Sequence, residues 1–248
     1  MMKLAVNKLN NKKITGILKE LKKDFLKNYD LIWLLEQSLG PGNWEVYGGE
    51  KGFLIKRNNI CWVNPLTGGE LDEFYKFITK DLPVHIHCYQ NWICQYLEEK
   101  HYRLSKGENI YLYCQRENFK GRKKRISSII TYEDVQKCKE KWYSPEILDF
   151  LKQNQKVYGI INGENLLLGW CYIDSLTKGV AEIYRIEIHP MNRRRGYAID
   201  ILSSAIEDIF NYENYVVINI DSNNIEGINL FQKLGFKEIQ REYRYLLK

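Results

Sequence analysis

The spacing of hydrophobic and polar residues changes several times along the chain, and each change marks the start of an expected helix or strand. From residue 14 to 25, apolar residues recur at helical spacing with lysines on the other face, which predicts an amphipathic helix. A second helix is expected over residues 29–39, because Gly40-Pro41 is a common signal for a helix end. The pattern then predicts strands at 52–56 and 60–63 around a turn, helices at 71–78 and 92–97, and strands at 84–88, 102–104 and 110–114.

The second half of the chain alternates strands and helices in a similar order. A strand is expected over residues 125–130, followed by helices that Thr131 and Ser144 cap. Asn162-Gly163 predicts a hairpin turn between strands at 157–161 and 166–173. The remaining expected elements are a strand at 182–188, a helix at 199–209, a strand at 215–220, a helix at 224–234 and strands at 237–239 and 243–247.

Two pairs of short segments indicate an internal repeat. Val63-Asn64-Pro65 parallels Ile188-His189-Pro190, and residues 96–102 parallel residues 230–236. Two unrelated α/β units would give the same order of elements, so the repeat is one of two hypotheses. In either case we expect two domains, residues 1–120 and residues 121–248.

Residues 182–198 combine a strand, a loop and the start of a helix. The strand ends at His189-Pro190, because proline has no N–H to continue a ladder. A helix start carries free backbone N–H groups, and Gly196 allows a ligand to approach them closely. Positive charge is added by Arg193, Arg194 and Arg195. The stretch therefore predicts an anion site whose geometry suits a phosphate group.

The sequence Arg193-x-x-Gly196-x-Ala198 resembles the Arg/Gln-x-x-Gly-x-Gly/Ala signature of the GNAT superfamily of acyl-CoA-dependent N-acyltransferases. Residues 224–236 resemble the Asn-x-x-Ala-x-x-Leu-Tyr-x-x-x-Gly-Phe segment of the same family. The resemblance covers residues 125–248 and implies an α+β fold with a mixed, mostly antiparallel central sheet flanked by helices. If the repeat is real, the fold is tandem and the first half is a degenerate copy, because Leu66-Thr67-Gly68-Gly69 carries no arginine.

The resemblance also implies a cofactor site. The loop before Ala198 would hold the pyrophosphate of coenzyme A, and the strand segment from Ile186 to Ile188 would pair with the pantetheine amides. A backbone N–H near Ile188 would face the thioester oxygen. Asn224 matches a family asparagine near the pantetheine arm, and the same residue also reads as a helix N-cap. The expected cofactor-binding residues are Ile186, Glu187, Ile188, Arg193, Arg194, Arg195, Gly196, Tyr197, Ala198, Asn224 and Phe231.

An N-acyltransferase needs a base, because an aliphatic amine with a pKa of about 10.4 is a cation at neutral pH. Glu182 is the first candidate, since it precedes Gly196 by fourteen positions and resembles the general base of the histone-acetyltransferase branch. Glu187 is the rival, and the odd spacing between the two glutamates predicts that they face opposite sides of the strand. Either carboxylate can instead be a surface residue or a salt-bridge partner of Arg185. Phe231 replaces the family's proton-donating tyrosine, so water or another tyrosine would protonate the departing thiolate.

Composition narrows the remaining alternatives. The 248 residues are 44% hydrophobic, but no apolar run approaches the roughly 18 residues that span a membrane, and the first residues lack a secretory signal. Six scattered cysteines indicate buried thiols in a reducing cytoplasm. The net charge of +6 gathers in residues 1–28 and 120–125, which favours a solvated helix face and a linker over nucleic-acid binding, because aromatics are not interleaved. His85 and His87 share a strand face without an evident third ligand, so no metal site is expected.

The expected function is that of an acetyl-CoA-dependent N-acetyltransferase acting on a primary amine, either a small molecule or a protein. A non-catalytic acyl-CoA-binding regulatory module is the alternative. We expect a cytoplasmic monomer or homodimer with no metal and no membrane partner. No motif in the sequence identifies the acceptor amine.

Overall fold

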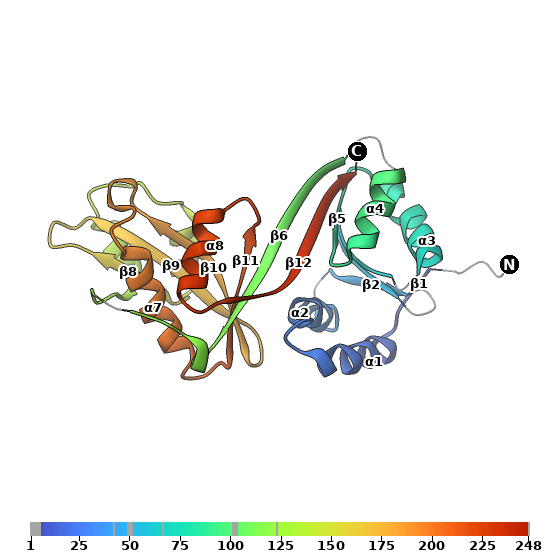
Figure 1. The fold of residues 1–248 in the computed structure, drawn as a ribbon, viewed down its shortest axis with the longest axis horizontal. Helices are drawn as coiled ribbons and strands as arrows, with labels where there is room; N and C mark the ends of the chain where they lie inside the picture. Colours follow the sequence, from blue (N-terminus) through green and yellow to red (C-terminus); the bar gives the residue numbers. More distant parts are fainter. Residues whose placement is uncertain are drawn as a thin grey trace. The chain divides into compact units, whose positions relative to one another are not determined.

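The computed structural model describes residues 6–41, 43–48, 52–65, 67–100, 104–122 and 124–247 of the chain (Figure 1). The chain divides into two compact units. Unit 1 is Met1–Ile110 with Ile239–Lys248, and unit 2 is Tyr111–Glu238. The sequence-based division lay between residues 120 and 121, whereas the compact units divide after residue 110 and again after residue 238. The last strand belongs to unit 1 because Tyr245 and Leu247 are buried in its core.

Unit 1 carries helices on both faces of its strands. Its elements are β1 (Asn7–Lys8), α1 (Asn11–Leu21), α2 (Tyr29–Ser38), β2 (Glu45–Gly48), β3 (Phe53–Arg57), β4 (Ile60–Asn64), α3 (Gly68–Ile78), β5 (Val84–Cys88), α4 (Asn91–Lys100), part of β6 (Leu104–Gln115) and most of β12 (Lys237–Leu247). The strand order is β1-β2-β3-β4-β5-β12-β6. Along β3, Leu54 packs with α3 and α4, whereas Phe53 and Ile55 pack with α1 and α2. Successive side chains of a strand alternate between faces, so one strand serves two cores.

Unit 2 is also layered. Its elements are β7 (Ser128–Ile130), α5 (Tyr132–Gln136), α6 (Glu146–Lys152), β8 (Val157–Ile161), β9 (Leu167–Thr177), β10 (Val180–Ile188), α7 (Tyr197–Ile209), β11 (Tyr215–Asp221) and α8 (Ile225–Lys233). The strand order is β6-β11-β10-β9-β8-β7. Val135 of α5 and Ile147 of α6 pack against Trp170 on one face. On the other face α7 lies close to the sheet, because a Cβ on Gly169 would be 2.9 Å from Cδ1 of Ile201.

The two units repeat one topology. In unit 1, β3 pairs antiparallel with β4, α3 follows, and β5 pairs parallel with β4. In unit 2, β9 pairs antiparallel with β10, α7 follows, and β11 pairs parallel with β10. The sheet pairing is therefore mixed and mostly antiparallel with flanking helices, and the expected α+β fold class is confirmed.

Two expected pairs of short strands are instead single long strands. β6 begins at Leu104, the described end of the expected strand at 102–104, and continues through the expected strand at 110–114. β12 spans residues 237–247 without a break. The polar residues of the expected breaks bond to neighbouring strands, since Arg241 pairs with Glu108 at 2.7 Å and Asn109 accepts a hydrogen bond from Arg244 at 2.5 Å. These partners are far apart in sequence, so a local pattern does not reveal them.

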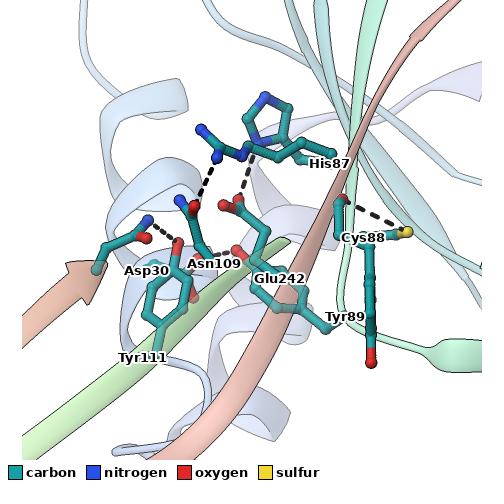
Figure 2. A network of polar contacts seen from close by, with 10 residues as sticks. Asp30, His87, Cys88, Tyr89, Asn109, Tyr111 and Glu242 are labelled. Atoms are coloured by element: carbon teal, nitrogen blue, oxygen red, sulfur yellow. Dashed lines mark hydrogen bonds and ion pairs between the residues drawn. The ribbon is translucent and has the colours of Figure 1, made fainter. Parts of the chain in front are cut away.

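A buried carboxylate lies among these polar residues (Figure 2). Glu242 is 2% exposed and accepts a hydrogen bond from Nδ1 of His87 at 2.8 Å. The ring of His87 also packs on Trp62, with centroids 4.9 Å apart. A buried charge requires such a partner, so His87 has a structural contact that accounts for its place on β5.

The local signals of unit 2 are partly borne out. Thr131 caps α5 with a reciprocal capping box to Asp134. Pro145, rather than Ser144, is the N-cap of α6, although Oγ of Ser144 accepts the N–H of Glu146 at 3.4 Å. β8 and β9 form the expected hairpin, but the chain reverses through residues 162–166 with its positive φ at Asn165. All six cysteines are buried.

Candidate active site

The start of α7 presents unused backbone donors. Arg194 and Gly196 both adopt positive φ angles, of 60° and 88°, which turn the chain sharply before the helix. Among the hydrogen bonds of the described residues, none is donated by a backbone N–H of residues 194–199. Successive N–H groups in such a turn form a concave anion site, and the helix dipole adds to its positive potential. The expectation that these amides are available for a ligand is consistent with this geometry.

A cavity of about 1070 Å³ opens beside this helix start. Most of the residues expected to bind the cofactor lie in its wall, namely Ile186, Glu187, Ile188, Arg193, Arg194, Gly196, Tyr197, Ala198 and Asn224. Arg195, Phe231 and Glu182 are not among its lining residues. The cavity brings together a strand end, a helix start and the N-cap of α8, which lie 38 residues apart at the extremes.

The wall formed by β10 is open toward β11. The parallel pairing of these strands covers only Val180, Ala181 and Glu182 of β10. β10 continues to Ile188 and β11 continues to Asp221, so the two strands separate beyond Glu182. An unpaired strand edge of this kind can accept an extended ligand as an added strand.

A β-bulge at Tyr184 changes which glutamates share a face. Glu182 pairs with Asp174 and Glu187 pairs with Trp170, and the register shifts between Ile183 and Arg185. Asp174 and Trp170 differ by an even number, so they share one face of β9 and their partners share the same face of β10. The expectation that Glu182 and Glu187 face opposite sides is therefore wrong, because the bulge adds one residue between them.

The carboxylate of Glu187 is held by three donors. Its Oε2 accepts the backbone N–H of Ser144 at 2.9 Å and the indole N–H of Trp170 at 3.1 Å. Its Oε1 accepts Nε–H of Arg185 at 2.9 Å. These contacts tie the segment before α6 to β10 and so fix one wall of the cavity.

Glu182 has different surroundings. Its cross-strand neighbour is Asp174, which accepts the hydroxyl of Tyr172 at 2.7 Å. The ring of Tyr184 stacks on Tyr172 with centroids 5.5 Å apart. Burial raises the pKa of Tyr184, and the negative charges of Glu182 and Asp174 raise it further. Glu182 is therefore part of a half-buried acidic and aromatic group at the point where β10 and β11 separate.

Asn224 and Phe231 have structural contacts in addition to any ligand role. Oδ1 of Asn224 accepts the N–H of Gly227 at 3.0 Å, so this residue is the N-cap of α8. Phe231 is 1% exposed and packs edge-on against Phe236, with centroids 5.2 Å apart. Phe231 supports α8 from behind the cavity wall rather than facing the cavity.

His189 is 7% exposed and lies between Ile188 and Pro190, which line the cavity, but does not line it itself. Its Nδ1 accepts the N–H of Met191 at 3.2 Å, so Nε2 carries the proton and donates to Glu140 at 3.1 Å. The ring meets Trp142 edge-on at 5.1 Å. Both ring nitrogens are engaged by protein partners, which gives His189 a structural role.

Two parts of the cavity wall were not predicted from the sequence. Glu226, Asn229, Leu230 and Lys233 line it from α8, and their helical spacing places them on one face, so periodicity would have identified them. Trp142, Tyr143 and Ser144 line it from an irregular segment. That segment is held by Glu187 and by the indole of Trp142, which donates to the carbonyl of Leu167 at 2.7 Å. No local signal predicts such long-range bonds.

The described part of the chain holds no group of three histidine, cysteine, aspartate or glutamate residues arranged to ligate a metal ion. Across the same described residues, every helix is too short or too polar to cross a membrane.

The chain resembles known proteins in part of its sequence and in its fold. Residues 157–245 match a protein-family model described as FR47-like protein. A solved Drosophila protein from a structural genomics consortium is 13% identical, with a TM-score of 0.69 over 98% of this chain and 99% of that chain. No curated protein matches the chain by sequence.

Two further solved structures carry descriptive names. A tandem GNAT protein from the clavulanic acid biosynthesis pathway is 11% identical, with a TM-score of 0.62 over 98% of each chain. A GCN5-related N-acetyltransferase from Sphaerobacter thermophilus is 12% identical, with a TM-score of 0.61 over 86% of this chain and 84% of that chain. At these identities the likeness concerns the fold. Together with the family match, it confirms the resemblance to the GNAT superfamily and to its tandem form.

Proposed function

From this GNAT fold as the premise, we propose that the chain is an acetyl-CoA-dependent N-acetyltransferase that acylates a primary amine. The observation that carries the proposal is the start of α7, where Arg194 and residues 196–199 line an open cavity and their amides donate none of the described hydrogen bonds. An anion with several acceptor oxygens, such as a diphosphate, matches that set of donors.

The proposed cofactor site uses three parts of the cavity wall. The amides before and within the first turn of α7 hold the diphosphate, and Arg193 and Lys233 add positive charge at the same cavity. Nε of Arg193 also donates to the carbonyl of Ile188 at 3.4 Å, which ties the loop to the end of β10. The open edge of Ile186 and Ile188 pairs with the amides of the pantetheine arm as an added strand would.

We assign Glu182 as the general base. An arm that begins at α7 and follows β10 backward from Ile188 ends where β10 and β11 separate, and Glu182 is the last paired residue there. Deprotonating an aliphatic amine at pH 7 costs about 4 to 5 kcal/mol, so a carboxylate at that point, acting directly or through water, lowers the barrier. Glu187 is the weaker candidate, because three donors already occupy its oxygens.

The transfer proceeds by attack of the neutral amine on the thioester carbon. The new C–N bond forms, the carbonyl oxygen becomes an oxyanion, and a backbone N–H near Ile188 stabilises it. The C–S bond then breaks and the thiolate takes a proton from water or a tyrosine hydroxyl, since Phe231 has none to give, and the hydroxide or tyrosinate so formed takes the extra proton from the nitrogen. The products are an N-acetyl amine and free coenzyme A.

A non-catalytic acyl-CoA-binding module is the second candidate, and the burial of Phe231 in place of a proton donor favours it. Turnover separates the two. With acetyl-CoA and a panel of primary amines, an acetyltransferase releases free thiol at a rate that depends on the amine, whereas a binding module releases none above the hydrolysis background.

Two variants of Gly196 test the cofactor assignment. We expect Gly196→Glu to weaken acetyl-CoA binding more than Gly196→Gln, because the two side chains share their bulk and strain but only glutamate repels the phosphates. Isothermal titration measures both dissociation constants. Equal affinities for the two variants, or undiminished affinity for Gly196→Glu, would count against a phosphate site at this turn.

A further inference from the structure

The basic segment before β7 is bound to α7 rather than extended into solvent. The backbone N–H of Arg122 donates to Oγ of Ser203 at 3.0 Å. The backbone N–H of Lys124 donates to Oδ1 of Asp200 at 2.8 Å. Nη1 of Arg125 donates to Oδ2 of Asp200 at 2.6 Å. Two of these three bonds, from two successive residues, end on one carboxylate.

Asp200 is an unusual neighbour for an anion site. It lies in the first turn of α7, and only 2% of its surface is exposed. A carboxylate at a helix start is favoured by the helix dipole, but it competes with a second anion for the same potential. Without a cation beside it, Asp200 would repel a diphosphate bound one turn away, and little water would screen the repulsion.

Arg125 lies behind the wall of the cavity. Its guanidinium carbon is 4.2 Å from the centroid of the Tyr197 ring, and Tyr197 lines the cavity whereas Arg125 does not. A Cβ built on Gly196 would be 3.7 Å from Nη1 of Arg125. The guanidinium therefore contacts Asp200 and Tyr197 and lies within reach of the turn at Gly196.

We propose that Arg125 is a positioning residue of the coenzyme A site, which cancels the charge of Asp200 and holds Tyr197 in the cavity wall so that a diphosphate can bind. The proposal rests on the proposed function. Arg125 belongs to a basic stretch that was expected from sequence to be a linker, and it thereby supports the site without contacting the ligand.

A double-mutant cycle tests this role. The four proteins are the wild type, Arg125→Met, Asp200→Asn and the double variant, and isothermal titration gives each dissociation constant for coenzyme A. We expect Arg125→Met to weaken binding on the order of tenfold, because it leaves Asp200 uncompensated. We expect the double variant to bind within about threefold of the wild type, because the repelling charge is gone with its partner.

Two further variants separate this role from general effects of charge and folding. Arg122→Met removes the same charge from an exposed side chain whose residue contributes only its backbone N–H, and we expect affinity within about twofold of the wild type. Arg125→Lys keeps the charge, and we expect it to retain most of the affinity. If Arg125→Met alone fails to fold, the double variant still carries the test, since its neutral pair leaves no buried charge.

The measured dissociation constants distinguish the following outcomes. A double variant as weak as Arg125→Met would overturn the proposal, because the guanidinium would then act on the ligand itself. Arg125→Met with wild-type affinity would also overturn it. If the wild type itself does not bind coenzyme A, the proposed function falls and the inference with it. If the wild type binds but the cycle shows no rescue, the inference alone is lost.

Discussion

At the scale of single residues, the two glutamates of β10 differ in what their carboxylates contact. Glu187 holds Ser144, Trp170 and Arg185, so its main effect is on the shape of the cavity. Glu182 lies at the end of the β10–β11 pairing. The bulge at Tyr184 places both carboxylates on one face, so the choice between them depends on their places along β10 and not on the face.

We predict that Glu182→Gln lowers the turnover rate at least tenfold while the dissociation constant for acetyl-CoA stays within about twofold, because a general base acts on the amine and not on the cofactor. Glu187→Gln is the matched control. It retains fewer acceptors for its three donors, so we expect about 1–3 kcal/mol less stability and a smaller effect on turnover. Thiol-release kinetics and chemical denaturation measure the two effects. A larger loss of turnover in Glu187→Gln would reverse the assignment.

At the scale of elements, the short helix α5 of unit 2 has a side-chain cap at its start. α5 spans only Tyr132–Gln136, and its capping box joins Thr131 to Asp134. The N–H of Thr131 donates to Asp134 at 2.9 Å, and its hydroxyl donates to the same oxygen. These bonds hold the pKa of the Asp134 carboxyl below its usual value. A folded-state pKa that is lowered stabilises the fold above the unfolded-state pKa, and this stability is lost as pH falls through the folded-state value.

We therefore predict that Asp134→Asn is less stable than the wild type at pH 7 and that the difference shrinks below about pH 4, where the unfolded carboxyl takes up its proton. Thr131→Ala removes the other half of the box and lowers the free energy of unfolding by about 1 kcal/mol at pH 7. Glu133→Gln removes the same charge from the same turn without a cap bond. Urea unfolding at several pH values gives the comparison, and equal pH profiles for Asp134→Asn and Glu133→Gln would contradict the role of the cap.

Among the elements, the polar parts of the long strands β6 and β12 were the hardest to predict. Residues 105–109 and 240–242 read as gaps between strands, because their side chains are mostly polar. They continue β6 and β12 because Glu108, Asn109 and Glu242 have partners on other strands. The helices α1, α3, α4, α7 and α8 were predicted within a few residues of their bounds, because each has an apolar face at helical spacing.

At the scale of the whole molecule, unit 1 is built from both ends of the sequence. Tyr245 and Leu247 of β12 lie in one core with α3 and α4. The corresponding helix starts of the two units also differ. The N–H of Glu70 in α3 is capped by Oγ1 of Thr67, whereas α7 begins at a glycine without a side-chain cap. One first-turn amide of α3 therefore has a protein acceptor, whereas the described hydrogen bonds include none donated by the amides of residues 194–199 at α7.

We predict that Leu247→Ala, at the end of the chain, lowers amide protection in unit 1, including β4 and β5 near the middle of that unit's strand order. Leu247 is 3% exposed, and such truncations cost about 2–5 kcal/mol. Leu202→Ala, in the core of unit 2, is the matched control and should lower protection in β8 and β9 instead. Hydrogen exchange followed by mass spectrometry resolves the segments. Equal loss in both units from either variant would show that they do not unfold separately.

The sequence by itself determined most of the helices and strands in their order and the turn from Arg193 to Ala198 that opens α7, whereas the α+β class was implied by the resemblance of residues 125–248 to the GNAT superfamily. The elements and the turn depend on local periodicity, on proline and glycine, and on charges a few residues apart. Tertiary structure alone decided that the last strand joins unit 1, that a bulge turns Glu182 and Glu187 to one face, and that Arg125 lies against α7. Each of these depends on a partner that is remote in sequence or on a register set by pairing, and no local pattern of residues carries that information.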